Sequence, residues 1–176
     1  MRSLALMLFL LPGMVLAVGS DDFAPPKPSE TTTTCAEDQI WDLATQSCMS
    51  PEDSTNDDNA RLDDIRELAY AGRYQTALRV LDALDDQRTS LALTYYGFVH
   101  RQIGQVERGM SYYAAALAVE PDNLLARSYM GQAHVLAGEV TLAQAQLTEI
   151  RMRGGRGTWA AHALARAIAT GKGYSH

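Results

Sequence analysis

Two cysteines are the residues of this chain whose spacing most directly suggests chemistry. Cys35 and Cys48 stand thirteen residues apart, and the chain has no other cysteine. An even number of cysteines predicts a disulfide if the chain is exported into an oxidising compartment. In the chain-entropy account such a bridge stabilises a loop of this size by roughly 3 kcal/mol. A zinc site is a poor alternative, because two thiols at this separation lack further ligands at zinc-site spacing.

The histidines are the next candidates for a functional site. His100 and His134 stand 34 residues apart, and no third metal ligand accompanies them, so we expect both rings to pack between helices. The chain contains no recognised nucleophile motif, P-loop or dinucleotide-binding signature. We therefore expect no catalytic residues, no metal and no cofactor, in a protein that is not an enzyme.

Three arginines lie in or beside a glycine-rich run near the C-terminus: Arg151, Arg153 and Arg156. Basic glycine-rich runs occur in nucleic-acid-binding segments, but a single copy in a chain of net charge −6 argues against that function. We interpret the run as a turn before a helix that Thr158 caps. An anion site between the arginines and that helix start is the alternative.

The elements that must position these residues are repeated along the chain. Tyr95-Tyr96-Gly97, Val99-His100 and Ile103-Gly104 return 34 residues later as Tyr129-Met130-Gly131, Ala133-His134 and Ala137-Gly138. A period of this length indicates stacked supersecondary units. Apolar residues recur at helical spacing on both sides of Gly72, Gly104 and Gly138, which predicts three antiparallel helix pairs with a glycine at each turn.

The repeats resemble the tetratricopeptide repeat family. The second repeat has a facing pair of small residues, a turn glycine, an aromatic residue and a final proline, in the order Gly97 facing Gly109, Gly104, Tyr113, Ala116 and Pro121. The third has Gly131 facing Ala143, then Gly138. The resemblance implies an all-α fold, a right-handed superhelical stack of three helix pairs over residues 60–170, with a terminal capping helix. The repeats would span about 58–89, 90–123 and 124–152, the capping helix 158–170, and a tail 171–176.

Members of this family bind a peptide in a concave groove that the first helix of each pair lines. By position, the groove of this chain would present aromatic, basic and amide side chains: Arg66, Tyr70, Tyr95, Phe98, Arg101, Gln102, Ser128, Tyr129 and Gln132. Aromatic residues and arginine dominate binding energy at interfaces. The lysines and asparagines of the family's carboxylate clamp are absent, so a chain-end carboxylate is not the expected ligand. Packing of the tyrosines between repeats is the alternative.

The N-terminal third of the chain has a different composition. A basic start, a short apolar run and small residues predict a cleaved signal peptide at residues 1–17, since the run is shorter than the roughly 20 residues of a membrane-spanning helix. Residues 18–60 hold ten Asp and Glu but one Lys. We expect a disordered spacer at 18–34, a disulfide hairpin at 35–48 and an acidic linker at 49–59.

These features predict an exported protein, periplasmic or secreted, that serves as a non-catalytic scaffold in the cell envelope. A protein or peptide partner would bind in the groove, with no nucleic-acid partner and no membrane span after signal cleavage. The alternative is a cell-wall glycan-binding protein that uses Trp41, because the hairpin resembles small cysteine-bounded hairpins that bind carbohydrate through an aromatic residue. A third hypothesis is that the repeats assemble a homo-oligomer.

Overall fold

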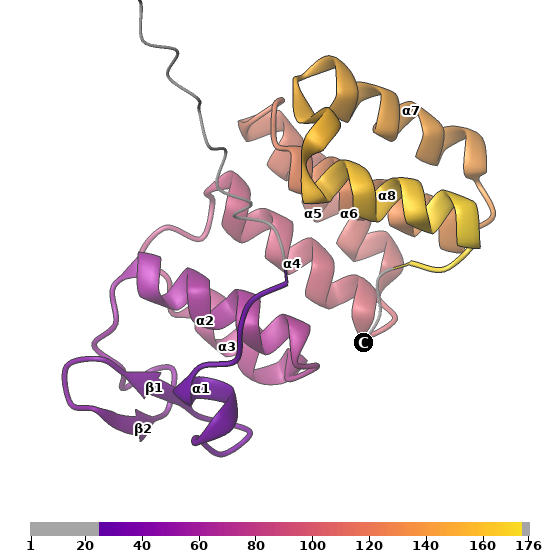
Figure 1. The fold of residues 1–176 in the computed structure, drawn as a ribbon. Helices are drawn as coiled ribbons and strands as arrows, with labels where there is room; N and C mark the ends of the chain where they lie inside the picture. The colour runs from indigo at the N-terminus through magenta and orange to yellow at the C-terminus, as the bar shows by residue number, and fades with distance from the viewer. Residues whose placement is uncertain (1–24, 174–176) are drawn as a thin grey trace, which may run out of the picture.

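Helices that pack against their neighbours in sequence make up most of the fold. The computed structural model describes residues 25–173, and Figure 1 shows its helices following one another from the purple end to the yellow end. The main helices are α2 Asp58–Tyr70, α3 Tyr74–Asp82, α4 Ser90–Gln102, α5 Val106–Val119, α6 Leu124–Leu136, α7 Val140–Met152 and α8 Trp159–Thr170. The prediction of sequentially packed helix pairs is confirmed. The predicted signal peptide at 1–17 lies outside the described residues.

Each pair turns at a glycine whose backbone is left-handed. Gly72, Gly104 and Gly138 have φ of +77°, +85° and +77°. Residues with a Cβ rarely adopt this conformation. The first helix of each pair therefore ends at the glycine that the sequence predicted as its turn residue. Side-chain caps begin the next first helices: Thr89 accepts a hydrogen bond from the Ala92 N–H, and Asn123 from the Ala126 N–H.

The central pair, α4 and α5, approaches closely where two glycines meet. A Cβ on Gly109 would lie 2.7 Å from the carbonyl oxygen of Gly97, and a Cβ on Gly97 would lie 2.5 Å from the Tyr113 ring. The predicted Gly97–Gly109 contact is therefore present. In the third pair, the atoms nearest to Gly131 belong to Leu164 of α8 and Gln146 of α7 rather than to Ala143.

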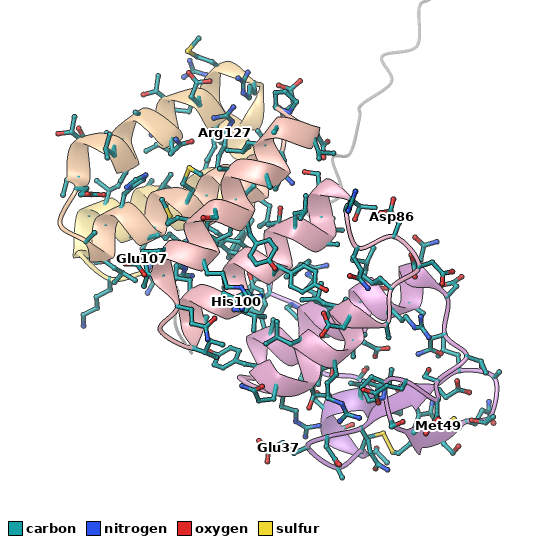
Figure 2. The ribbon with its side chains drawn as sticks, turned by 180° about the vertical axis from the view of Figure 1, so that it is seen from behind. Glu37, Met49, Asp86, His100, Glu107 and Arg127 are labelled. Carbon is teal, nitrogen blue, oxygen red and sulfur yellow. A yellow bond between two sulfur atoms is a disulfide. The ribbon has the colours of Figure 1, made fainter. Side chains whose placement is uncertain are left out.

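A two-stranded hairpin precedes the helical stack. Strand β1 (Ile40–Asp42) pairs antiparallel with β2 (Ser47–Met49), so that Trp41 stands opposite Cys48. The predicted Cys35–Cys48 disulfide is present and closes the hairpin, and Figure 2 shows it near Met49. Ile40 and Asp42 are completely buried, whereas Trp41, on the other face of the strand, is half-buried. The predicted disulfide hairpin is confirmed.

The prediction of a disordered spacer at residues 18–34 is wrong for its last part. Residues 30–33 form the short helix α1 (Glu30–Thr33), which packs against α2. Thr31 is buried and donates a hydrogen bond from Oγ1 to Oδ1 of Asp64, 2.6 Å away, and the Ser29 N–H donates to Oε1 of Glu67 at 2.8 Å. The threonine run offers little apolar surface, and hydroxyl and amide donors to carboxylates of α2 order it.

Arg73, at the turn between α2 and α3, fixes the same segment from the other side. Its guanidinium donates to the carbonyl oxygens of Thr31, Thr32 and Cys35 at 2.9, 3.0 and 3.2 Å. Five donors in a planar fork allow one arginine to satisfy several carbonyl groups of a turn. The first helix pair therefore holds α1 in place.

The acidic linker predicted at 49–59 is also a packed segment. Asp42 accepts hydrogen bonds from the Thr55 N–H at 2.6 Å and from the Ser54 hydroxyl at 3.2 Å. Asn56 donates from Nδ2 to the Trp41 carbonyl and to Asp64. Hydrogen bonds to Asp42 of the hairpin and Asp64 of α2 hold this stretch in place, although its acidic composition predicted a linker. We call residues 29–56, with α1 and the hairpin, the cap; Figure 1 shows it at one end of the stack.

Candidate functional site

The predicted concave groove is closed in this structure. Seven of its nine predicted residues are buried: Tyr70, Tyr95, Phe98, Arg101, Ser128, Tyr129 and Gln132. Arg66 and Gln102 are half-buried. The sequence pattern correctly indicated that these residues share one face of the helices. In the structure that face is packed as part of the core. This burial corrects the prediction that they line an open groove.

Aromatic rings from four helices fill the space where the groove was expected. Tyr70 of α2 stacks on Phe98 of α4 with ring centroids 5.8 Å apart, and Phe98 contacts Tyr129 of α6 at 4.8 Å. The hydroxyl groups of Tyr70 and Tyr129 lie 2.8 Å apart. Trp159 of α8 completes the cluster, 6.3 Å from Tyr70 and 6.2 Å from Tyr129. Burial raises the pKa of Tyr129 well above its ordinary value, so its hydroxyl stays protonated.

Polar groups of the predicted groove bind inside the same cluster. The Ser128 hydroxyl donates to the Ala160 carbonyl of α8 at 2.8 Å, so α8 covers this part of α6. Arg101 places its guanidinium 5.4 Å from the Phe98 ring centroid and 3.4 Å from the Tyr113 hydroxyl. The Ser128 hydrogen bond and the Trp159 ring therefore make α8 a cover over the face that was expected to recognise a ligand, while Arg101 binds within α4 and α5.

The two histidines have separate surroundings. His100 is buried, and its ring stacks on Tyr112 at 5.3 Å, in the middle of the molecule in Figure 2. Burial, with the nearby Arg108 charge, lowers the pKa of His100. His134 Nδ1 lies 2.7 Å from Oε2 of Glu139. Within residues 25–173, no cluster of three or more His, Cys, Asp and Glu residues is arranged to hold a metal ion.

The C-terminal arginine run forms the predicted turn. Gly154 is left-handed, with φ +83°, and Gly155–Gly157 form a short 3₁₀ helix before Thr158 caps α8. Arg153 pairs with Asp122 and Glu149, with N···O distances of 3.3 and 3.0 Å. Its charge is therefore matched within the chain, which weakens the alternative of an anion site. In the same described part of the chain, no helix has the length and apolar character needed to cross a membrane.

A cleft of about 520 Å³ remains open between the cap and α2. We call it the cap cleft. The hairpin contributes Trp41 and Leu43, and α2 contributes Ala60, Asp63, Asp64, Arg66 and Glu67, with Pro25, Pro26, Lys27, Ser29, Glu30, Thr31 and Asn56 completing the walls. The structure thus brings together two residues that the sequence assigned to different sites, Trp41 of the hairpin and Arg66 of the expected groove.

The floor and the rim of the cap cleft differ in electrostatics. On the floor, Asp64 is buried, and this burial raises its pKa to about 6 although Thr31 and Asn56 donate hydrogen bonds to it. Glu67 is also buried and accepts hydrogen bonds from the Ser29 and Thr32 N–H groups. On the rim, Glu30 and Asp63 are exposed. The floor carboxylates hold the cap in place, which leaves the rim carboxylates for contact with a ligand.

The apolar side of the cap cleft is formed by Trp41 and Leu43. Trp41 is half-buried, and Leu43 is 64% exposed at the hairpin turn. The Trp41 backbone is fixed on both sides of its Cα, because Thr31 Oγ1 accepts from its N–H and Asn56 Nδ2 donates to its carbonyl. An aromatic ring on a rigid backbone beside an exposed leucine is a preformed apolar contact surface.

Sequence reasoning did not foresee the cap cleft. Asp63, Asp64 and Glu67 read as ordinary charged residues of an amphipathic helix, and nothing local to the hairpin indicates which helix it packs against. The available signal was the threonine run before Cys35, whose hydroxyls are suited to bind carboxylates. Comparison of the chain with protein-family models, curated proteins and solved structures found no match.

The fold places the chain in a structural class. The described chain is a helical protein of sequentially packed helix pairs with a small N-terminal hairpin that a disulfide closes. The cap cleft lies at the junction of these two parts. A disulfide of this kind is typical of proteins that fold in an oxidising compartment outside the cytoplasm.

Proposed function

We propose that this protein is an exported, non-catalytic binding module of the tetratricopeptide-like class, which takes a segment of a partner protein into the cap cleft. The 34-residue period and the paired helices with left-handed turn glycines support the family assignment. The disulfide supports export to the periplasm or the extracellular space. We place the partner contacts at the N-terminal edge of the expected groove rather than within it. Arg66 lines the cap cleft at that edge.

One observation carries the proposal: the hairpin presents Trp41 and Leu43 in the same cleft as Asp63 and Arg66 of α2. Tryptophan and arginine are the residues that most often dominate binding energy at protein interfaces, especially in partly enclosed sites that exclude water. A leucine that is 64% exposed is a further apolar contact for a partner. The charged rim can orient a bound segment, because polar groups fix register while apolar groups supply affinity.

The proposal is tested by capture of partners from envelope extract with the full processed protein. We expect Trp41→Ala to reduce capture of the specific partner by ten-fold or more, since loss of a central aromatic residue costs about 2 kcal/mol or more. Leu43→Ser should also reduce it. Leu142→Ser is the matched control, because Leu142 is 48% exposed but lies on α7, away from the cap.

The same partners captured in equal amount by all variants would refute the assignment to the cap cleft. Circular dichroism of each variant separates loss of binding from loss of fold. A partner lost on Leu142→Ser but kept on Trp41→Ala would place the contact surface on the helical stack instead.

Cell-wall glycan is a second candidate ligand for the same cleft. The half-buried Trp41 ring offers an apolar face on which a sugar ring can stack, and the exposed carboxylates of Glu30 and Asp63 can accept hydrogen bonds from sugar hydroxyls. Sedimentation with purified peptidoglycan distinguishes this candidate from a protein partner. Binding that Trp41→Ala abolishes would favour the glycan, and no sedimentation of the wild-type protein would eliminate it.

A further inference from the structure

We infer that a second cavity, on the face of α4 away from Phe98, binds a doubly charged tetrahedral oxyanion between Arg88 and Arg108, beside the buried ring of His100. A free phosphate or sulfate ion, or a phosphate ester, carries such a group. The inference is independent of the proposed function, because this cavity shares no lining residue with the cap cleft. We call it the histidine cavity.

The histidine cavity has a volume of about 460 Å³ and lies between α3 and α5, against α4. Its charged and aromatic side chains are Asp82 of α3, Arg88 of the loop that follows, Tyr96 and His100 of α4, and Arg108 and Tyr112 of α5. The two residues from α4 are four positions apart, as are the two from α5, so each pair lies on one face of its helix. The packing of the first two helix pairs therefore assembles the cavity, and Figure 2 shows His100 in the middle of the molecule.

A surplus of positive charge is the first observation. Arg88 and Arg108 are both exposed, and among the described residues neither forms an ion pair. Asp82 is the one carboxylate among the described residues that line the cavity, and its Oδ1 already accepts a hydrogen bond from the Tyr96 hydroxyl at 2.7 Å. Two guanidinium groups are thus available to an anion in a chain whose net charge is −6.

An unsatisfied polar atom in the wall of the cavity is the second observation. His100 is only 4% exposed, and its Nδ1 is buried without a hydrogen-bond partner. A buried polar atom without a partner is costly, and native proteins rarely retain one without a reason. Because the His100 ring lines the cavity, a ligand oxygen can accept a hydrogen bond from Nδ1 once this nitrogen carries a proton.

Neighbouring rings hold the imidazole in position, which is the third observation. Tyr112 stacks on Tyr96 and on His100, with ring centroids 5.0 and 5.3 Å apart and interplanar angles of 16° and 4°. The Arg108 guanidinium lies over the Tyr112 ring, 5.9 Å from its centroid. The wall of the cavity is therefore formed before a ligand binds, so binding requires little ordering of these side chains.

A tetrahedral dianion fits these groups better than a carboxylate does. Arg88 comes from a loop and Arg108 from a helix, so a shared ligand must present oxygens in more than one direction. Arginine binds phosphate oxygens through charge-assisted, often bidentate hydrogen bonds. Two negative charges also match two guanidinium groups, whereas a carboxylate supplies one charge and two oxygens in a plane.

The charged groups that face His100 couple binding to pH. They are Asp82 of α3, Arg88 of the loop and Arg108 of α5. Burial, with the Arg108 charge, lowers the pKa of His100, so its ring is neutral at pH 7 in the free protein. A bound dianion offsets the Arg108 charge and accepts from Nδ1, which raises this pKa. By linkage, the anion then binds more tightly as pH falls through the pKa of His100.

NMR titration of the histidine rings in the full processed chain tests the inference, with sodium sulfate as the probe because sulfate keeps its charge across the pH range used. His100→Gln assigns the His100 signal among the four histidines. We expect sulfate to shift this signal saturably and to raise the pKa of His100 by about 1, with a sulfate Kd about ten-fold lower below that pKa than above it. Sodium chloride at equal ionic strength is the salt control, and acetate should bind much more weakly than sulfate.

Arg88→Gln is the decisive variant, because Arg88 is exposed and its side chain forms no hydrogen bond or ion pair within residues 25–173 that folding would lose. It should weaken sulfate binding several-fold and leave the far-UV circular dichroism unchanged. Arg108→Gln should weaken binding as well. Arg151→Gln is the matched control, since Arg151 is an exposed arginine of α7 outside the cavity.

Equal sulfate affinity of Arg88→Gln and Arg151→Gln would overturn the placement of the anion, and sulfate binding that leaves the pKa of His100 unchanged would overturn the role of the imidazole. Chloride effects as large as those of sulfate, or acetate binding as tight, would overturn a specific oxyanion site. Methyl phosphate that binds as sulfate does would assign a phosphate ester as the ligand, and methyl phosphate that fails where sulfate binds would assign the free ion.

Discussion

Asp64 shows at the scale of single residues how a polar side chain can organise a part of the molecule. It is 8% exposed, it accepts hydrogen bonds from Thr31 Oγ1 and Asn56 Nδ2, and it joins α1 and the segment after the hairpin to α2. Burial raises its pKa from 3.8 to about 6. The shift corresponds to roughly 3 kcal/mol that ionisation of Asp64 costs the folded state at neutral pH.

The first prediction at this scale concerns pH. Since the folded-state pKa of Asp64 lies above the unfolded one, the native state binds more protons between about pH 4 and 6, and the contribution of Asp64 to stability falls as pH rises through that window. Asp64→Asn should remove this dependence. We expect the wild type to lose about 2 kcal/mol relative to the variant between pH 4 and pH 7, as measured by urea unfolding.

Asp63→Asn is the matched control, because Asp63 is the exposed neighbour on the same helix. Its unfolding free energy should follow that of the wild type across the same pH range. Parallel pH profiles for wild type and Asp64→Asn would show that Asp64 titrates normally in the folded protein.

At the scale of elements, the packing of the helices determines whether the face expected to bind a ligand is open or closed. The α4–α5 pair depends on the approach of Gly97 and Gly109, whereas α8 depends on Trp159, Leu164 and the hydrogen bond from Ser128 to Ala160. The terminal helix therefore does more than shield the end of the stack, because its tryptophan reaches the aromatic cluster of the first and third pairs. This packing closes the face that the resemblance assigned to ligand binding.

The second prediction tests the close approach of α4 and α5. Gly109→Ala places a Cβ 2.7 Å from the Gly97 carbonyl oxygen, a backbone atom that cannot move away without moving α4. Alanine favours a helix by about 1 kcal/mol over glycine, yet overpacking costs typically 1–3 kcal/mol and more where backbone is displaced. We expect a net loss of about 2 kcal/mol in the free energy of unfolding.

Gly157→Ala serves as the control, because a Cβ there meets no atom within 4 Å and the backbone is not left-handed. Its stability should stay within about 0.5 kcal/mol of the wild type. A Gly109→Ala protein as stable as the wild type would mean that the two helices do not approach as closely as the structure shows.

At the scale of the whole molecule, the cap and the helical stack pack together and share one hydrophobic core. Arg73 binds carbonyl groups of the cap, Thr76 donates to the Glu37 carbonyl at 2.7 Å, and Arg79 pairs with Glu52 at 2.5 Å. Ile40 of the hairpin belongs to the same hydrophobic core as residues of α2 and α4. A change in the cap should consequently be felt by the helices.

The third prediction follows from this union. Reduction of the Cys35–Cys48 disulfide removes about 3 kcal/mol of stabilisation in the chain-entropy account. Because the cap shares a core with the helices, we expect the helical transition, followed by far-UV circular dichroism, to remain single and to shift down by roughly 10 °C. A Cys35→Ser, Cys48→Ser variant should show the lower midpoint without reductant and no response to it.

An unchanged helical transition after reduction would indicate that the hairpin unfolds as a separate unit. In that case the cap cleft, which both parts form, would open before the helices unfold, and binding through Trp41 would be lost at a lower temperature than helical structure.

Local signals account for what could be predicted about this protein. Apolar spacing, turn glycines and caps are properties of a few consecutive residues, so the helices from α2 to α8, the turns at Gly72, Gly104 and Gly138, and the disulfide hairpin could be inferred before any coordinates. The 34-residue period extended this inference to the pairing of helices. These features depend on backbone conformation and on one covalent bond.

Only the tertiary structure determined which surface is available for binding. A periodic pattern shows which residues share a face, but not whether a distant element covers that face. Trp159 lies 89 residues after Tyr70 and packs against it, and Thr31 lies 33 residues before Asp64 and binds it. Burial by such contacts closed the predicted groove around Tyr95 and Phe98, and left Trp41 and Arg66 together in the cap cleft.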